Sequence, residues 1–400
     1  MAEARFQHIP IPSWELIASL RDEAGPEFGE IARLLGVIYQ LELHDQLQLL
    51  ERAYAPFNPD LDERTPSRAK KSNDDAAREL AERLSAVLER GNYERLTEDD
   101  INHAFGTRSL FPINVVVDTS VYADFVVYAR GETNRSASIP RWYGIARKTI
   151  PVPTFDRVCI YIRFKSAADL GLAPNELAKQ PFEPGTTVMK LFRNIPKADL
   201  EMVFPNCRPT MRPVDKLLFG VPALVGGIPV ILKLIPAAFA LAIVFGLTGG
   251  NVDTKALITG LGGLAVLGSY LWRQWDKFKN RRILFGKVLT ENLYFRNLDT
   301  NEGVLTRVVD EAGDEECKEA LLGYVFARRA GDWVSAEELD GSIEKYLSER
   351  FGMEVDFEIG DALAKIEALG LLERDGERLR ARAGEQAAAQ LRARLAELTG

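Results

Sequence analysis

The side chains best suited to metal binding or acid–base catalysis are few in this sequence, and they are not grouped. The histidines are His8, His44 and His103. His44 is adjacent to Asp45, which is not the spacing of three or four residues that places two ligands on one helix face. We therefore expect each histidine to be solvated or packed in a core, and we predict no metal site.

The cysteines are equally scattered. They are Cys159, Cys207 and Cys317, and no two of them form a C-x-x-C pair. This spacing argues against a disulfide framework and against a cysteine-based zinc site, and it fits a reducing compartment.

No motif of a known catalytic or cofactor-binding class is present. The sequence contains no phosphate-binding loop, no G-x-G-x-x-G, no G-x-S-x-G and no H-E-x-x-H. The acidic run from Asp310 to Glu316 is typical of a solvated helix start. We predict a non-enzymatic protein with no catalytic residue and no cofactor. A membrane-bound enzyme is an alternative, and it would need a polar pocket with a strongly perturbed carboxylate or histidine in the sheet domain.

The elements that would position any site are divided by a long apolar stretch. The net charge is −8 and the mean hydropathy is −0.11, yet the long apolar runs fall between Leu217 and Trp272. Ile228–Thr248 and Ala256–Trp272 have about the length that a bilayer core requires. They predict a transmembrane hairpin, with two buried helices of a globular core as the alternative. Lys233 lies near one end of the first span, where its stem can carry the ammonium to the interface.

Basic and aromatic residues flank this hairpin and predict its orientation. By the positive-inside rule they place both termini in the cytoplasm, with a multi-pass location in the inner membrane. We predict contact with membrane lipids, anionic ones by charge, for Arg208, Arg212, Lys216, Trp272, Arg273, Trp275, Lys277, Lys279, Arg281 and Arg282.

The flanking regions read as α+β. Apolar residues at steps of three and four predict helices over 13–55 and 74–90, and Thr97 with Asp100 matches a capping pattern. Strand patterns occur at 113–117, 121–128, 142–150, 157–164 and 186–192. We expect a small antiparallel sheet on the preceding helices. A ligand pocket there is an alternative to a plain scaffold.

The C-terminal region has the order helix, helix, helix, hairpin. The predicted helices are 316–328, 335–349 and 358–369, and Asp375-Gly376 forms the hairpin turn. This order is typical of a winged helix. Residues 315–383 carry 10 Lys and Arg against 17 Asp and Glu, a net of −7. This charge would repel phosphate, so we predict no nucleic acid and favour a protein partner or self-assembly.

The sequence thus predicts an α+β membrane protein in six parts. These are a helical N-terminal region at 1–109, an α+β domain at 110–210, the hairpin at 217–272, a juxtamembrane basic connector at 273–312, a winged-helix-like domain at 313–383 and a C-terminal helix at 384–400.

Several segments resemble the transmembrane protein 143-like family, which carries a domain of unknown function. They are 6–12 (FQHIPIP), 152–158 (VPTFDRV), 190–202 (KLFRNIPKADLEM), 293–299 (LYFRNLD), 309–312 (VDEA) and 316–320 (ECKEA). The resemblance implies a membrane protein with paired helices, and no catalytic residue can be carried over. Two of these segments contain a similar F-R-N motif, at 191–195 and 294–298. The likeness predicts structural pairing or one juxtamembrane platform, with a chance similarity as the alternative.

The function favoured by these patterns is a membrane scaffold or regulator whose cytoplasmic domains bind a protein partner or form a homo-oligomer. The alternative is an oligomeric ion or small-solute pathway, with Lys233 near its lumen.

Overall fold

The computed structural model describes residues 6–21, 25–58, 73–106, 114–141, 146–177, 180, 182–210 and 293–400, with isolated positions between 258 and 280. The chain divides into two compact units. The first comprises Met1–Thr107, Thr119–Val203 and Arg296–Gly400, and the second comprises Arg108–Asp118 and Phe204–Phe295. In the second unit, β2 (Asn114–Val116) pairs antiparallel with β6 (Arg208–Thr210).

Among the residues described, no helix is both long enough and apolar enough to cross a bilayer. The two longest, α2 (Phe28–Tyr54) and α9 (Glu302–Ala330), have the length, but charged residues recur along both. This finding contradicts the predicted membrane protein and its multi-pass inner-membrane location. The described residues instead form a mixed α and β fold with antiparallel sheets. The first predicted span and Lys233 lie outside the described residues, as does most of the second span.

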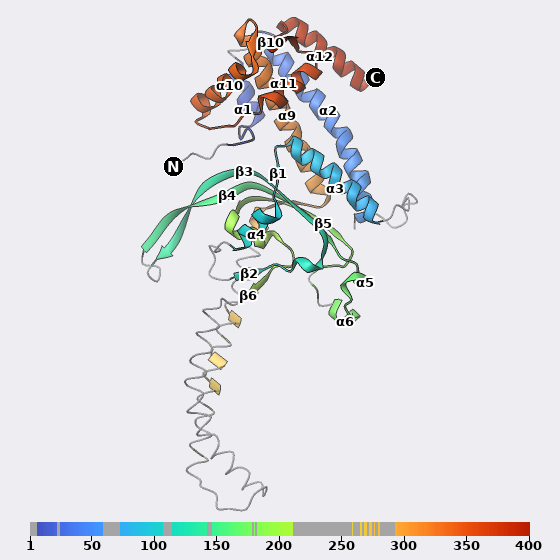
Figure 1. The fold of residues 1–400 in the computed structure, drawn as a ribbon, viewed down its shortest axis with the longest axis vertical. Coiled ribbons are helices and arrows are strands. Elements are labelled where there is room, and N and C mark those ends of the chain that lie inside the picture. The colour runs from blue at the N-terminus through green and yellow to red at the C-terminus, as the bar shows by residue number, and fades with distance from the viewer. Residues whose placement is uncertain are drawn as a thin grey trace, which may run out of the picture. The chain divides into compact units, whose positions relative to one another are not determined.

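The first unit has two apolar cores, and α2 and α9 contribute to both. Phe28 to Tyr39 of α2 and the C-terminal half of α9 pack in one core with α1 (Ser13–Leu20) and the C-terminal elements. Leu43 to Tyr54 of α2 and the N-terminal half of α9 pack in the other with α3 (Asn73–Arg90) and the sheet (Figure 1). The two helices thus connect the cores.

The main sheet has the strand order β1-β3-β4-β5-β7 and is antiparallel. Its strands are β1 (Glu94–Arg95), β3 (Tyr122–Arg141), β4 (Ala146–Phe164), β5 (Thr187–Pro196) and β7 (Asn297–Thr300). Two predicted strands join into β4 despite Pro151 and Pro153. This is possible because residues 146–153 pair with β3 alone among the described strands, so a missing N–H interrupts no ladder on the other side.

The two F-R-N motifs lie close together, as the interpretation of structural pairing predicts, because the second motif ends at Asn297, the first residue of β7. Phe192 on β5 is the register partner of Asn297 on β7. The Arg296 guanidinium also donates to the Asn194 carbonyl at 2.8 Å.

Short helices fill the remaining connections. They are η1 (Ala55–Phe57), α4 (Glu98–Gly106), η2 (Thr119–Val121), α5 (Ala167–Leu170), α6 (Pro174–Leu177) and η3 (Lys197–Val203). The predicted cap of α4 is present, because Thr97 Oγ1 accepts from the Asp100 amide while the Asp100 carboxylate accepts from the Thr97 amide.

The C-terminal elements follow winged-helix order. The end of α9 is followed by β8 (Val334–Ser335), α10 (Ala336–Phe351), α11 (Ile359–Ala368), β9 (Leu372–Asp375) and β10 (Arg378–Ala381). The small sheet has the order β8-β10-β9. Gly376, in the predicted hairpin turn, has a φ of +60°. The last helix, α12 (Gly384–Thr399), packs against α2, where Arg392 forms two hydrogen bonds with Glu30.

A capping box begins α10, and its contribution can be measured. Ser335 Oγ accepts from the Glu338 amide, and the Glu338 carboxylate accepts from the Ser335 amide. Replacing Ser335 by Ala should lower the free energy of unfolding by about 1 kcal/mol. Urea denaturation checks this value. Ser342→Ala is the control, because Ser342 lies within the same helix and its hydroxyl donates only to the Glu338 carbonyl. Equal losses in the two variants would contradict the capping role.

Candidate functional site

A pocket of about 790 Å³ lies in the first unit between the main sheet, α9 and the segment Phe6–Pro12, which we call the strap. We call this cavity the charged pocket, because ionisable side chains dominate its walls. The sheet wall contains Arg130, Arg135, Asp156, Arg157, Asn194 and Asp299, and the strap wall runs from His8 to Pro12. The remaining wall is α9.

One face of α9 supplies that wall. Gly303, Thr306, Arg307, Asp310, Glu311, Asp314, Glu315 and Lys318 all line the pocket. They recur at steps of three and four, which places them in one stripe along the helix. Val304, Leu305, Val308 and Ala312 fall between them and are buried in the sheet-side core. One face of α9 therefore packs in the apolar core, and another face carries the charged side chains that line the pocket.

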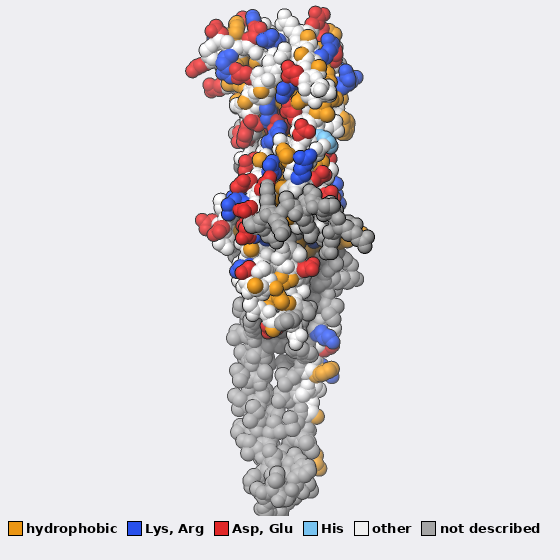
Figure 2. Space-filling model, turned by 90° about the vertical axis from the view of Figure 1, so that its right-hand side faces the viewer, with side chains coloured by type: hydrophobic (Ala, Val, Ile, Leu, Met, Phe, Trp, Pro, Cys, Tyr) orange, Lys and Arg blue, Asp and Glu red, His pale blue; other side chains and the backbone are white. Residues whose placement is uncertain are grey.

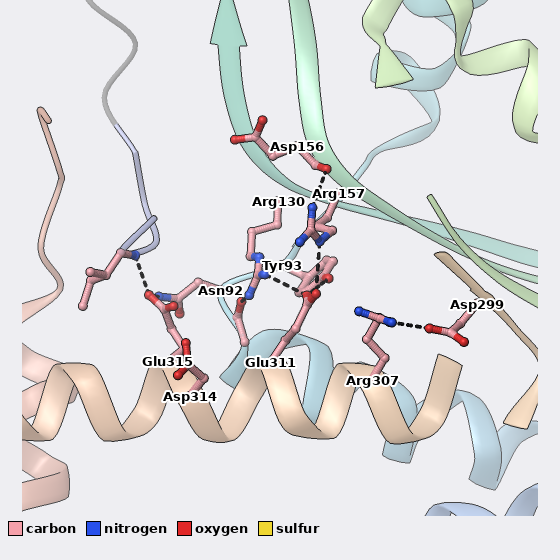
Figure 3. Close-up of polar contacts among 12 residues, drawn as sticks. Asn92, Tyr93, Arg130, Asp156, Arg157, Asp299, Arg307, Glu311, Asp314 and Glu315 are labelled. Carbon is pink, nitrogen blue, oxygen red and sulfur yellow. Dashed lines mark hydrogen bonds and ion pairs between the residues drawn. The ribbon is translucent and has the colours of Figure 1, made fainter. Parts of the chain in front are cut away.

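Glu311 lies at the centre of the pocket and joins α9 to the sheet (Figure 3). Its Oε2 accepts from Arg130 Nη2 at 2.7 Å and from the Tyr93 hydroxyl at 2.5 Å. Its Oε1 accepts from Arg157 Nε at 3.0 Å. Arg130 also donates to the Gly91 carbonyl at 3.1 Å and stacks over the Tyr93 ring at 4.7 Å. One carboxylate thus holds two guanidinium groups.

This arrangement keeps Glu311 ionised. Burial by itself would raise the pKa of its carboxyl group, but the charges of Arg130 and Arg157 and the hydrogen bonds outweigh that effect and lower the pKa. Burial raises the pKa of Tyr93 well above its ordinary value, so its hydroxyl remains a donor. The centre of the pocket is therefore a fixed carboxylate between two fixed cations.

The strap is attached through its backbone to α9 and to the segment that precedes α11. The Ile9 amide donates to Glu315 Oε1 at 2.6 Å, and Lys318 Nζ donates to the Ile9 carbonyl at 2.6 Å. Phe6 forms a parallel bridge with Val355, which precedes α11. Asn92, which follows α3, donates to the Gln7 carbonyl at 3.1 Å. Three separate parts of the first unit, α9, the segment before α11 and the turn after α3, therefore hold this segment.

His8 projects from the strap to the sheet wall and is 7% exposed. Gly131 on β3 has a φ of +67°, and a Cβ atom there would lie 2.6 Å from His8 Cε1 and 2.7 Å from Asp156 Oδ2. Glycine is thus required for the ring to approach the strand. Burial, together with the charges of Arg130, Lys318 and Arg157, lowers the pKa of His8 to about 3. The imidazole is neutral at physiological pH.

Two ion pairs complete the sheet wall. Arg135 donates to Asp156 Oδ1 at 3.2 Å, and Thr133 donates to the same oxygen at 3.1 Å. Arg307 of α9 pairs with Asp299 of β7.

The chemistry available in this pocket is recognition of charge more than proton transfer. Glu311 is a poor general base because two cations stabilise its ionised form. His8 has a pKa far below the range that suits acid–base catalysis near neutrality. In the part of the chain that the structure describes, no group of three or more His, Cys, Asp or Glu residues could hold a metal ion.

The residues predicted to contact lipid do not lie in this pocket. Arg208 begins β6 in the second unit. Trp272, Arg273 and Lys279 are helical and exposed. The others, Arg212, Lys216, Trp275, Lys277, Arg281 and Arg282, lie outside the described residues, and so does Lys233.

The sequence interpretation allowed a ligand pocket in the sheet domain as an alternative, but it named none of the residues that form the charged pocket. It predicted the acidic run at 310–316 to be a solvated helix start, and this is wrong, because the run lies within α9 and Glu315 and Glu316 are buried. Arg157 begins the predicted strand 157–164, and Arg130 lies two residues beyond the predicted strand 121–128. A charge in a buried strand needs a counter-charge, and the carboxylates of α9 supply it. The sequence correctly allowed a core position for His8.

Comparison with known proteins finds a partial match to a family model. A model of a protein family of unknown function (DUF3754) matches residues 155–303, which is less than half of the chain. The match contains the pocket residues Asp156, Arg157, Asn194 and Asp299, together with Gly303 at the start of α9. No solved structure matches the chain.

Removing the charge of Glu311 should destabilise the first unit. Glu311→Gln leaves the Arg130 guanidinium, whose side chain is 10% exposed, without its counter-charge, and we expect a loss of about 3 kcal/mol in the free energy of unfolding. Glu367→Gln is the control, because Glu367 forms an exposed pair with Arg374 that solvent screens, so its loss should change the free energy of unfolding much less. Urea unfolding measures both. A loss at Glu311 no larger than that at Glu367 would show that the central network is not a stabilising one.

His8 predicts a specific dependence of stability on pH. Its pKa is lower in the folded protein, about 3, than the ordinary 6.5, so the unfolded chain binds the proton first. Stability is therefore lost as the pH falls from about 6.5 towards about 3, by at most about 1.4 kcal/mol per pH unit. His8→Gln should lose less stability than the wild type over this range, as followed by urea unfolding at pH 7, 6 and 5. Parallel profiles for the two proteins would contradict the assignment.

Proposed function

We propose that the chain is a non-enzymatic scaffold or regulatory protein whose winged-helix-like module binds a protein partner. The observation that carries this proposal is the charge of the exposed face of α11, the helix that would enter a DNA groove in a winged helix. Glu358, Asp361 and Glu367 are exposed there. Lys365 is turned inward, with its side chain 11% exposed and paired with Glu319 and Asp361.

The wing adds little free positive charge. Arg374 pairs with Glu367 at 2.9 Å, and Arg380 pairs with Glu373 at 2.6 Å while stacking on Trp333. Acidic and basic side chains are interspersed on the face of the molecule in Figure 2. Nucleic-acid affinity rests largely on phosphate neutralisation, so this module favours a protein with a basic surface.

An enzyme is the competing function class, because the charged pocket is polar and contains a strongly perturbed histidine. The direction of the perturbation argues against it: the lowered pKa makes His8 a weaker base at neutral pH. The paired state of Glu311 argues the same way. We therefore propose that the pocket recognises rather than transforms what enters it.

We further propose a relation to the transmembrane protein 143-like family, confined to the segments that line the pocket. All six resembling segments contribute pocket residues: His8 from 6–12, Arg157 from 152–158, Asn194 from 190–202, Asp299 from 293–299, Glu311 from 309–312 and Lys318 from 316–320. Segments far apart in sequence thus meet at one place, which supports a shared role for the pocket.

The partner proposal can be tested with charge reversal on α11. The full-length chain, tagged and expressed in the cells from which it comes, should co-purify with a partner protein. That partner, once purified, should bind the purified chain in calorimetry. Glu358→Arg with Glu367→Arg should weaken that binding by at least about tenfold, because both reversals repel a basic partner. Light scattering on the same samples distinguishes self-association from binding of a different protein.

Glu349→Arg, on α10, is the matched control and should leave the affinity unchanged, since its side chain is 69% exposed and pairs only loosely with Lys345. Fluorescence anisotropy with labelled duplex DNA tests the competing possibility that the module binds nucleic acid. Salt-dependent DNA binding by the wild type, or equal weakening by both sets of variants, would refute the proposal.

A further inference from the structure

The charged pocket contains two buried nitrogen atoms that no described group of the protein satisfies. They are His8 Nδ1 and Arg130 Nε. His8 is 7% exposed and the Arg130 side chain 10%, and both residues line the pocket. Buried polar atoms nearly always have a partner. An acceptor on a bound molecule could therefore meet both residues.

The surrounding charges determine what kind of acceptor fits. Next to His8, the three arginines Arg130, Arg135 and Arg157 pair with only two carboxylates, Glu311 and Asp156, while the remaining carboxylate of the sheet wall, Asp299, pairs with Arg307 of α9. Burial is the largest cause of the depressed pKa of His8, and the charges of Arg130, Lys318 and Arg157 lower it further, which is consistent with a positive potential at the ring. This end of the pocket therefore favours a negatively charged acceptor.

The arginines keep donors for such a group. Arg157 uses its Nε for Glu311 and its Nη1 for the Asp156 carbonyl. Arg135 uses Nη2 for Asp156, and its side chain is 52% exposed. A guanidinium has five N–H groups in a planar fork that matches carboxylate and phosphate oxygens. The ion pairs within the protein thus hold the arginine side chains in place and leave some of their N–H donors for a bound group.

The size of the cavity indicates more than a single inorganic ion. Its volume, about 790 Å³, is in the range of small-molecule sites. The opposite wall presents the exposed carboxylate of Asp310, which could accept from hydroxyl or amino groups of the same molecule.

We propose that the charged pocket binds a small organic acid or phosphate ester, with its carboxylate or phosphate group held by His8, Arg130, Arg135 and Arg157. This site is separate from the α11 surface, so its test is independent of the partner proposal.

Calorimetry on the full-length chain is the first experiment, with pyrophosphate and citrate as probes at constant ionic strength. We expect saturable binding of one anion per chain, and the stronger probe identifies the phosphate or the carboxylate class. Arg157→Gln should weaken binding at least about tenfold, because it removes a charged hydrogen-bond donor. Arg163→Gln is the matched control: it lies on the same strand, pairs with Asp74 outside the pocket, and should bind as the wild type does.

A second measurement remains informative if Arg157→Gln fails to fold. The chain has only three histidines, His8, His44 and His103, so ¹H–¹⁵N imidazole spectra with His8→Gln as reference identify the His8 signal. The anion should shift the His8 resonances and leave the other two unchanged. Absence of binding by both probes, equal weakening in the two arginine variants, or an unmoved His8 signal at saturation would each overturn the proposal.

Discussion

The fold of the first unit depends on the burial of charge in the middle of one helix. Glu315, Glu316, Lys318 and Glu319 of α9 are each less than 5% exposed, at the level where the two apolar cores meet. A buried charge without a partner is severely destabilising, so each requires a counter-group from elsewhere in the chain. Arg90 meets Glu316 at 2.7 Å, Lys365 meets Glu319, and Asn92 donates to Glu319 at 2.8 Å. The end of α3, the strap and α11 are thereby positioned relative to α9.

The charged pocket is a consequence of this arrangement. The carboxylates on the next turns of α9 continue the same stripe towards the sheet, where Arg130 and Arg157 provide the opposite charges. The strap closes one wall because Glu315 and Lys318 bind the backbone of Ile9. Asn92, with a φ of 57°, accepts a left-handed backbone that lets its side chain reach both the strap and the helix. The same helix continues into the winged-helix-like module, so the pocket and the proposed docking surface share a rigid element.

Local signals in the sequence predicted local structure well. Helices 335–349 and 358–369, the Thr97 and Ser335 caps and the Asp-Gly turn follow from periodicity and capping chemistry, which act within a few residues. The sequence predictions that were wrong depend on interactions between residues that lie far apart in the sequence. The acidic run at 310–316 resembles a solvated helix start because the arginines that neutralise it lie more than 150 residues away. Hydropathy alone predicted a membrane protein, whereas no described helix could span a bilayer. A pocket in the sheet domain was an alternative, but its lining residues could not be named, since its walls meet only in the folded chain.

The backbone amide of Ile9 offers the most direct test of this account, through amide hydrogen exchange followed by NMR. If the buried charges of α9 hold the strap, the Ile9 amide, bonded to Glu315 at 2.6 Å, should exchange as slowly as the core amides of α9 such as that of Leu321. It should lose most of this protection in Glu315→Gln, in which the acceptor is neutral. Rapid exchange of Ile9 in the wild type, at the rate of an unstructured terminus, would contradict the claim that the charged helix organises the fold.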